Sequence, residues 1–283
     1  MSPKEMVAQA KDLPLVSPAA LKLVRLLGRP SVSNEDVVEA LKCDSVLTGK
    51  LLGACNSPYF GFEEPVTSVD QAVLILGHQQ ILYVVMNLVL GSAMGIALPG
   101  YAIEANELWR HALTTAMTAE VILSGGAEVG VEPSVAFTAG LLHDIGKLVL
   151  TQFLTPESQS AICRLIEQEG LSRAEAEKEV LGANHCEAGA WLLQTWGVPE
   201  EIVQAVADHH QPSLHPRPGL SAVTHMANCI AHLAGSAPGW EAYALRADNQ
   251  VAEALNITSD KLESLVITAR DSFQRAEQFM NTV

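Results

Sequence analysis

Positive charge is scarce in this sequence. Its 283 residues include 17 Lys and Arg against 32 Asp and Glu, which gives a formal net charge of −15. The chain has no run of basic residues, so it lacks the side chains with which general nucleic-acid binders neutralise phosphates. The composition therefore argues against non-specific binding of DNA or RNA.

Cysteine is also scarce, and its pattern excludes a disulfide framework. The five cysteines are an odd number, form no CxxC pair and follow no secretory signal; they are Cys43, Cys55, Cys163, Cys186 and Cys229. We therefore predict buried free thiols in a reducing, cytoplasmic compartment. A chain of this length buries about three quarters of its unfolded surface, so folding needs no covalent or metal staple.

Only one hydrophobic run approaches the length of a membrane span. No charged residue occurs from Gln71 to Ile103, and the stretch Ile81 to Leu98 is mostly apolar. Asn87 and Gly91 dilute it, however, and no Lys or Arg cluster flanks it. We expect residues 71–98 to form a helix buried on all sides rather than a membrane segment.

Strands are missing from the pattern as well, whereas helix signals dominate. Ser33 with Asp36, Asp44, and Ser68 with Gln71 are N-terminal capping signals, and Pro99 ends this first group. Further helices are predicted at about 103–124, 133–153, 155–169, 172–182, 184–196, 199–209, 218–235, 247–255 and 259–280. The predicted fold is all-α, with an N-terminal helical bundle over 1–99 packed on a second helical unit over 100–235. C-terminal helices over 236–283 are expected to pack on that second unit.

The last helix carries an apolar stripe with two interpretations. The stripe comprises Leu262, Leu265, Val266, Ala269, Phe273 and Ala276. Packing against the protein's own core is favoured, and a contact with a partner or a second copy is the alternative.

Nine histidines are present, and five of them occur in contexts that belong together. His143 and Asp144 lie in an apolar segment, where a buried carboxylate without compensation costs several kcal/mol. A divalent metal ion supplies that compensation. His111, His185 and the pair His209-His210 lie on three other predicted helices, and imidazole is a ligand suited to borderline transition metals.

A structural interpretation competes with the metal interpretation for each histidine taken alone. A single histidine in an apolar helix is usually a core residue with satisfied hydrogen bonds, and His209-His210 near a helix C-terminus complements the helix dipole. The other four, His78, His215, His225 and His232, are interpreted as structural or surface residues. The specific signal is His143-Asp144 followed by Gly146-Lys147.

This combination resembles the HD superfamily of metal-dependent phosphohydrolases, in which a histidine, an adjacent His-Asp pair and a downstream aspartate bind metal. The residues that match are His111, His143, Asp144 and Lys147. The additional His185, His209 and His210 resemble the extra ligands of the two-metal HD-GYP branch, which hydrolyses cyclic di-GMP. The closing aspartate falls at Asn228, and no Gly-Tyr-Pro follows the histidine pair.

The N-terminal half resembles the HDOD family of bacterial signalling modules, in which a helical bundle packs on an HD-like domain. The matching segments are Leu13-Pro14-Leu15, Asp44, Ala54 to Ser57 with Phe60-Gly61, Ser68 to Ala72, and Leu76-Gly77. The resemblance covers about residues 10–235. It implies a regulatory module with little or no catalysis that binds a signalling protein partner, with a nucleotide ligand and a homodimer left open.

Two functions follow from these resemblances. In a hydrolase, Asp144 would bridge two ions, one held by His111 and His143 and one by His185, His209 and His210, while Lys147 would offset phosphate charge. Asn228 brings an amide oxygen without charge, so one divalent ion (Fe, Zn, Ni or Mn) is expected rather than two. The net charge of −15 also repels a polyanionic substrate. The regulatory module with a retained metal site is therefore the favoured hypothesis, and a cyclic-dinucleotide phosphodiesterase is the alternative.

Overall fold

The protein is built from helices, as the sequence predicts. The computed structural model describes residues 1–10, 22–23, 26, 33–125, 127, 129–214, 218–239 and 248–280. Within these ranges there is no strand, and the β contact is an isolated bridge between Leu98 and Ile103. The all-α prediction is confirmed.

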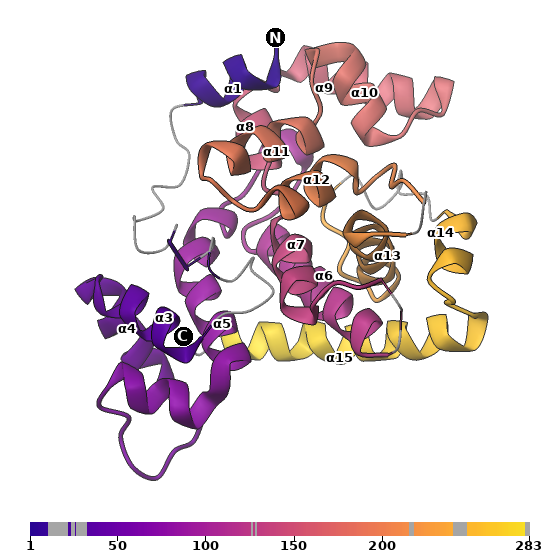
Figure 1. Ribbon diagram of the computed structural model, residues 1–283. Coiled ribbons are helices and arrows are strands. Elements are labelled where there is room, and N and C mark those ends of the chain that lie inside the picture. The colour runs from indigo at the N-terminus through magenta and orange to yellow at the C-terminus, as the bar shows by residue number, and fades with distance from the viewer. Residues whose placement is uncertain are drawn as a thin grey trace.

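Three helices form a group at the lower left of Figure 1: α3 (Asn34–Lys42), α4 (Ser45–Cys55) and α5 (Val69–Met94). Ser33, Asp44 and Ser68 cap them, each accepting hydrogen bonds from backbone N–H groups of the first turn, as their sequence context predicts. The segment Leu13-Pro14-Leu15, used for the family resemblance, lies outside the described residues.

Helix α5 is interrupted, which the hydrophobic pattern does not predict. Gly77 has φ 73°, a left-handed conformation that favours glycine, and divides the helix into two segments. Leu74 in the first segment is 83% exposed and Ile75 is 47% exposed, so the expected burial on all sides is wrong there. The second segment is buried through residues such as Ile81 and Leu90. None of the described helices is long and apolar enough to cross a membrane.

The first helix, α1 (Pro3–Gln9), lies away from α3–α5, at the top of Figure 1. It packs against α11 (His185–Thr195) and α8 (Lys147–Leu150). The amino group of Met1 donates a hydrogen bond to the carbonyl of Leu181 at 3.1 Å. By its contacts, α1 belongs with the second group of helices.

The second group surrounds α6 (Glu107–Ser124), which packs against α7, α13 and α15. Its other helices are α7 (Pro133–Leu142), α9 (Pro156–Arg164), α10 (Arg173–Leu181), α12 (Glu200–Asp208), α13 (Leu220–Leu233), α14 (Asn249–Ala254) and α15 (Ser259–Met280). Short helical turns are η1 (Pro99–Tyr101), η2 (Thr151–Phe153) and the π-helical η3 (Leu165–Glu169).

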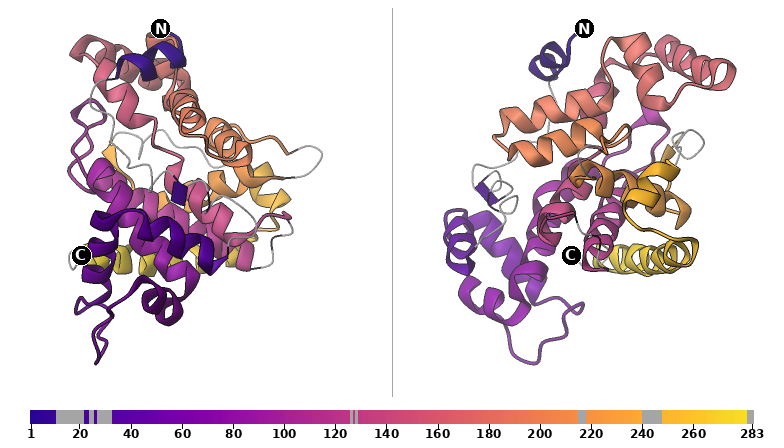
Figure 2. Two further views of the ribbon diagram at one scale, coloured as in Figure 1. Left: turned by 60° about the vertical axis from the view of Figure 1, so that its left-hand side comes forward. Right: turned by 45° about the vertical axis from the view of Figure 1, so that its right-hand side comes forward.

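Helix α15 runs along the base of this second group, as both views of Figure 2 show. It contacts α6 and α13. Leu265 and Ala269 of its apolar stripe are buried, whereas Ile267 is exposed. The described part of the stripe therefore packs on the protein's own helices, and the side chain of Ala276 lies outside the described residues.

The predicted helix over 133–153 is instead two helices, α7 and α8, joined by a turn at His143–Gly146. Two glycines allow neighbouring backbones to approach this region. A Cβ on Gly140 would lie 2.8 Å from Cα of Ala116 on α6, and a Cβ on Gly146 would lie 1.9 Å from the carbonyl oxygen of His185. The absence of these two side chains brings α6 and the start of α11 against the His143-Asp144 turn.

Candidate metal centre

Four histidines from separate segments converge on Asp144. The Nε2 atoms of His111 and His143 lie 3.8 and 3.3 Å from its Oδ2. The Nε2 atoms of His185 and His209 lie 3.7 and 4.0 Å from its Oδ1. All five side chains are fully buried. The structure thus places the predicted residues at one site, with one carboxylate oxygen facing each pair of imidazoles.

His210 occupies the outer edge of this site. Its Nε2 lies 3.0 Å from Nε2 of His185, and the residue is half-buried. His209 ends α12 and His210 follows it directly, so the two rings sit side by side with centroids 4.2 Å apart. This residue connects the buried site with the surface.

Asn228 is buried on α13, and its Oδ1 has no hydrogen-bond partner among the described residues. It shares a face of α13 with His225 and His232, at helical spacing. His225 donates from Nδ1 to the carbonyl of His209 at 2.8 Å, and the ring of His232 lies 4.7 Å from that of His111. That face of α13 therefore lines the site. His225 and His232, which are predicted from the sequence to be structural or surface residues, support this face of α13 at the site.

The ligand-type nitrogens are held in one orientation by hydrogen bonds on the far side of each ring. A backbone carbonyl accepts at 2.7–2.8 Å from each Nδ1, in the pairs His111 with Ser236, His143 with Gly140, and His209 with Val206. Because a carbonyl only accepts, Nδ1 carries the proton in these rings and Nε2 carries the lone pair. Metal-ligating histidines are oriented in this way.

The hydrogen bonding of these residues, considered apart from their sequence pattern, also fits a metal ion. Among the described residues, no hydrogen-bond partner reaches Nε2 of His111, His143 or His209, or Oδ1 of Asp144, although all four atoms are buried. Burial lowers the pKa values of His111 and His209 well below the ordinary value, as do the charges of neighbouring histidines. Neutral imidazoles with unused lone pairs around a carboxylate are donors that a divalent cation would satisfy.

Lys147 already supplies one positive charge to this site. Its Nζ donates a hydrogen bond to Oδ2 of Asp144 at 2.7 Å, and both side chains are fully buried. Burial raises the pKa of Asp144, but the charges of His143 and Lys147 outweigh it and hold the pKa well below its ordinary value. The carboxylate is therefore ionised, and an internal ammonium group partly neutralises it.

Behind His185 lies a buried carboxylate that the sequence analysis does not identify. Glu177 on α10 accepts hydrogen bonds from Nδ1 of His185 at 2.7 Å and from its backbone N–H at 3.0 Å. Nε of Arg173 donates to the same carboxylate at 3.0 Å. Burial raises the pKa of Glu177, but the charges of His185 and Arg173 lower it to about 2. Glu177 lies eight residues before His185, and no motif around it would identify it from the sequence.

Cys186 is a second residue whose place at the site the sequence analysis misses. The donor atoms of His185, Cys186, His209 and His210 all lie within 4.8 Å of one another. The same holds for a separate group, His111, His143 and Asp144. We call these the thiol cluster and the carboxylate cluster. The adjacency of Cys186 to His185 is the signal that could have pointed to it.

A cavity of about 540 Å³ adjoins the thiol cluster and is lined by His210 and Cys186. Its other walls include the acidic Glu175, Glu187 and Asp208 and the basic Lys178. Lys178 pairs with Glu187, which leaves an excess of negative charge. The cavity is therefore an acidic approach to the thiol cluster.

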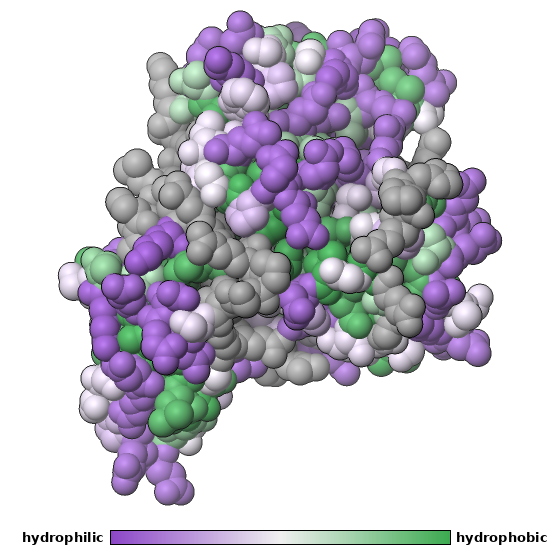
Figure 3. Space-filling model, viewed as in Figure 1, coloured by the Kyte–Doolittle hydropathy of each residue, from purple (hydrophilic) through white to green (hydrophobic). Residues whose placement is uncertain are grey.

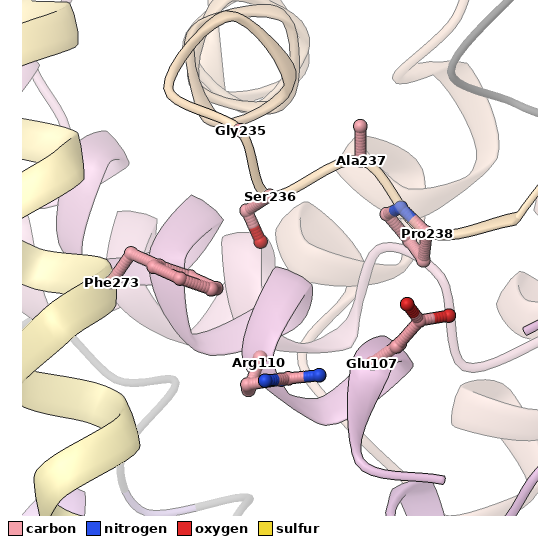
Figure 4. Close-up of a pocket in the computed structure, with 7 residues that line it drawn as sticks. All are labelled: Glu107, Arg110, Gly235, Ser236, Ala237, Pro238 and Phe273. Carbon is pink, nitrogen blue, oxygen red and sulfur yellow. The ribbon is translucent and has the colours of Figure 1, made fainter. Parts of the chain in front are cut away.

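A smaller cavity, of about 160 Å³, lies on the opposite side of His111 and is shown in Figure 4. Glu107 and Arg110 line it from α6, Ser236, whose carbonyl accepts a hydrogen bond from His111, lies across from them, and Phe273 of α15 closes one side. The guanidinium of Arg110 lies 5.8 Å from the ring centroid of Phe273. Arg110 thus lines this cavity and contributes a positive charge to it.

Two predicted structural or surface histidines are not placed by the structure. His215 lies outside the described residues, and the side chain of His78 is not described.

Known proteins share this fold and sequence pattern. An uncharacterised protein of Treponema pallidum is 26% identical over 232 residues, which are 80% of this chain and 44% of the relative. A Marinobacter aquaeolei VT8 structure, assigned by its name to signal transduction, matches 98% of this chain and 64% of its own with a TM-score of 0.74 and 22% identity. A Shewanella amazonensis SB2B structure, whose name proposes a phosphohydrolase, matches 97% of both chains with a TM-score of 0.68 and 23% identity.

At these identities the two structures show the fold alone, and the chain spans less than half of the length of the Treponema relative. The model of the HDOD domain matches residues 13–212, well over half of the sequence. The chain belongs to the HDOD family.

Proposed function

We propose that this chain is a cytoplasmic HDOD signalling module that binds one divalent transition-metal ion, from among Fe, Zn, Ni and Mn, and acts through a protein partner with little or no catalysis. The observation that carries the proposal is the convergence of four buried imidazoles on Asp144, where Nε2 of His111, His143 and His209 has no hydrogen-bond partner among the described residues. Such a donor set is expensive to bury without a cation.

One ion rather than two is supported by the charges at the site. In the carboxylate cluster, Lys147 already contacts Asp144, and Asn228 stands where the superfamily has a second anionic ligand. A divalent ion there would meet one carboxylate and a nearby ammonium group. The cavity beside the thiol cluster has an excess of carboxylates, so a cation is favoured there.

The surroundings of the site argue against turnover of a cyclic dinucleotide. Asp144, Lys147, His111 and His143 are completely buried, whereas hydrolysis requires the phosphodiester to contact the reacting centre. The cavity at His210 has an excess of carboxylates, which repel a phosphodiester. Both features favour a cation over an anion as the molecule that enters.

Partner binding is supported by the surface of the N-terminal helices. Val46 on α4 is 67% exposed, and Leu74 at 83% and Ile75 at 47% lie on the first segment of α5. Figure 3 shows green, hydrophobic atoms over this lower-left part of the molecule. Exposed apolar side chains of this kind are common at protein interfaces.

The alternative function is a metal-dependent phosphodiesterase. It is favoured by the geometry of Asp144, which presents one carboxylate oxygen to each cluster as a bridging ligand would. Metal ions at such a site activate water and stabilise phosphoryl charge. In that case His111 and His143 would hold one ion, His185, His209 and His210 the other, and Lys147 would face the phosphate.

The experiment that tests the proposal combines metal analysis with hydrolysis. The protein is purified without a chelating column or EDTA, and its metal content is measured by plasma mass spectrometry. Hydrolysis of cyclic di-GMP and of bis(p-nitrophenyl) phosphate is then followed with added manganese. Wild type, Asp144→Ala and, as a control, Glu201→Ala at an exposed carboxylate of α12 are compared.

We expect about one bound ion per chain in wild type and in Glu201→Ala, less in Asp144→Ala, and no hydrolysis above the metal-only blank. Turnover by wild type that Asp144→Ala removes would make the phosphodiesterase the correct function. Metal-free wild-type protein that takes up no ion on dialysis would contradict both functions.

A further inference from the structure

Cys186 begins α11 together with His185, and its thiol belongs to the more accessible of the two clusters. Asn184 caps this helix by accepting a hydrogen bond from the backbone N–H of Glu187. Consecutive helical residues point about 100° apart, so His185 and Cys186 both reach the end of α12, where His209 and His210 lie. The contact between α11 and α12 fixes this arrangement.

The spacing of the four donor atoms matches a tetrahedral metal site. Zinc binds imidazole nitrogen at about 2.0–2.1 Å and thiolate sulfur at about 2.3 Å, which separates ligand atoms by about 3.5 Å. In the thiol cluster every pair of donor atoms lies within 4.8 Å, and the Nε2 atoms of His185 and His210 are 3.0 Å apart. Small side-chain rotations suffice to close the set around one ion.

We propose that Cys186 is a direct ligand of the bound ion, which is held by three imidazoles and one thiolate in the thiol cluster. This inference rests on the proposed function, because it assigns the position and the fourth ligand of the same metal. It also assigns the class of ion. A sulfur ligand favours zinc, iron or cobalt over manganese and magnesium, which take oxygen donors.

The thiolate supplies a negative charge, which no imidazole ligand provides. Coordination breaks the S–H bond of Cys186, the sulfur electron pair forms the bond to the metal, and the proton passes to water in the adjoining cavity. Cys186 lies in the first turn of α11 and is buried beside His185. The ion thereby obtains an anionic ligand without competing with Lys147 for Asp144.

Glu177 and the acidic cavity complete this interpretation. The hydrogen bond from Nδ1 of His185 to Glu177 directs Nε2 into the cluster, in the carboxylate–histidine–metal arrangement common at metal sites. Glu175, Glu187 and Asp208 line the cavity next to Cys186 and His210, so the approach attracts a cation. The acidic cavity and the four donor atoms therefore both favour a cation.

Cobalt(II) is the probe that tests this inference, because a cobalt–thiolate bond produces a charge-transfer band in the near ultraviolet and imidazole or carboxylate ligands do not. Metal-free wild type, Cys186→Ser and Cys55→Ser are titrated with cobalt(II). Cys55 is a matched control, since its thiol is equally buried but lies on α4. We expect the band in wild type and Cys55→Ser, its loss in Cys186→Ser, and a cobalt affinity weakened about tenfold or more in that variant.

A second measurement uses wild-type protein alone and does not depend on the folding of a variant. Zinc(II) should protect Cys186 from alkylation by iodoacetamide, as read by peptide mass spectrometry, while the exposed Cys43 reacts equally with and without zinc. Cobalt binding by wild type without the charge-transfer band, together with unprotected Cys186, would overturn this inference and leave the metal site intact. Absence of cobalt binding by wild type in equilibrium dialysis would overturn the proposed function itself.

Discussion

The two donor clusters at Asp144 differ in how their charge is balanced. The carboxylate cluster is fully buried, and its Asp144 is paired with the ammonium group of Lys147 at 2.7 Å. The thiol cluster borders an acidic cavity and holds a thiol in place of a carboxylate. The charge of Asp144 is thus balanced by a neighbouring side chain, whereas the acidic cavity beside the thiol cluster keeps an excess of negative charge. Similar numbers of ligand-type residues do not imply equal metal occupancy.

The largest effect is expected from Asp144→Ala, which removes the carboxylate that faces histidines of both clusters. Lys147 would be left as a buried, unpaired charge, and breaking a buried ion pair costs about 3–5 kcal/mol. We expect the free energy of unfolding in urea to fall by that amount and the metal content to fall with it. The double variant Asp144→Ala/Lys147→Met should recover much of the stability. Equal loss in both variants would show that the ion pair is not the cause.

Acidification should weaken the support of the thiol cluster through Glu177. Its pKa is about 2 in the folded protein against an ordinary value of 4.5, so the unfolded chain binds the proton more readily. The resulting stabilisation is complete above about pH 4.5 and is lost as the pH falls toward about 2; it amounts to about 3 kcal/mol. Denaturation of metal-free protein from pH 7 to pH 3 measures it.

Glu177→Gln should lose this part of the pH dependence, so that its stability approaches that of wild type at the acidic end. Glu179→Gln, an exposed neighbour on the same helix, is the control and should follow wild type throughout. A Glu177→Gln curve parallel to that of wild type would rule out this carboxylate as the source.

Gly146→Ala should disturb the junction between the two clusters. The added Cβ would lie 1.9 Å from the carbonyl oxygen of His185, so α11 must move away from the turn that holds Asp144. Overpacking of this kind costs about 1–3 kcal/mol. Thermal unfolding measures the loss, and metal analysis shows whether the clusters still share Asp144.

Gly53→Ala is the matched control. Nothing lies within 4 Å of a Cβ at Gly53 in α4, and alanine is favoured over glycine in a helix by up to about 1 kcal/mol. This variant should be as stable as wild type or more stable. If Gly146→Ala lowers the thermal stability no more than Gly53→Ala does, the close approach of α11 to the turn is readily relaxed.

The smallest effect is expected from Asn228→Asp, which tests whether the carboxylate cluster can be made to resemble a metal site with two anionic ligands. We expect an affinity gain of about tenfold for manganese, equivalent to about 1.4 kcal/mol, measured by calorimetry. Asn228→Leu, which has a similar volume and no ligand oxygen, should show no gain. An unchanged affinity in Asn228→Asp would indicate that Lys147 rather than the missing carboxylate limits binding.

The sequence predicts the helical class and the residues that meet at Asp144. Capping side chains such as Ser33 and Asp44 act over three residues, so their effect is local and readable. The histidines were identified because an ionisable pair in an apolar segment needs compensation, and His143-Asp144 is such a pair. These inferences need only the chemistry of neighbours along the chain.

Other features depend on contacts between distant segments and were not predicted. Cys186 becomes a candidate ligand only when α11 and α12 pack together. Glu177 becomes the hydrogen-bond partner of His185 only through the turn between α10 and α11. The break at Gly77 lies inside a continuous apolar run. The sequence does not predict this break, because hydropathy does not record a positive φ angle. The docking of α1 on α11 likewise leaves no periodic signal in so short a segment.

The ion pair between Lys147 and Asp144 has a consequence for biosynthesis. In small metal-dependent domains such as zinc fingers, the ion is required for the chain to fold at all. Here the buried carboxylate has a covalently attached counter-ion that is present from the moment of translation. The nascent chain therefore needs no metal ion to neutralise this carboxylate while it folds.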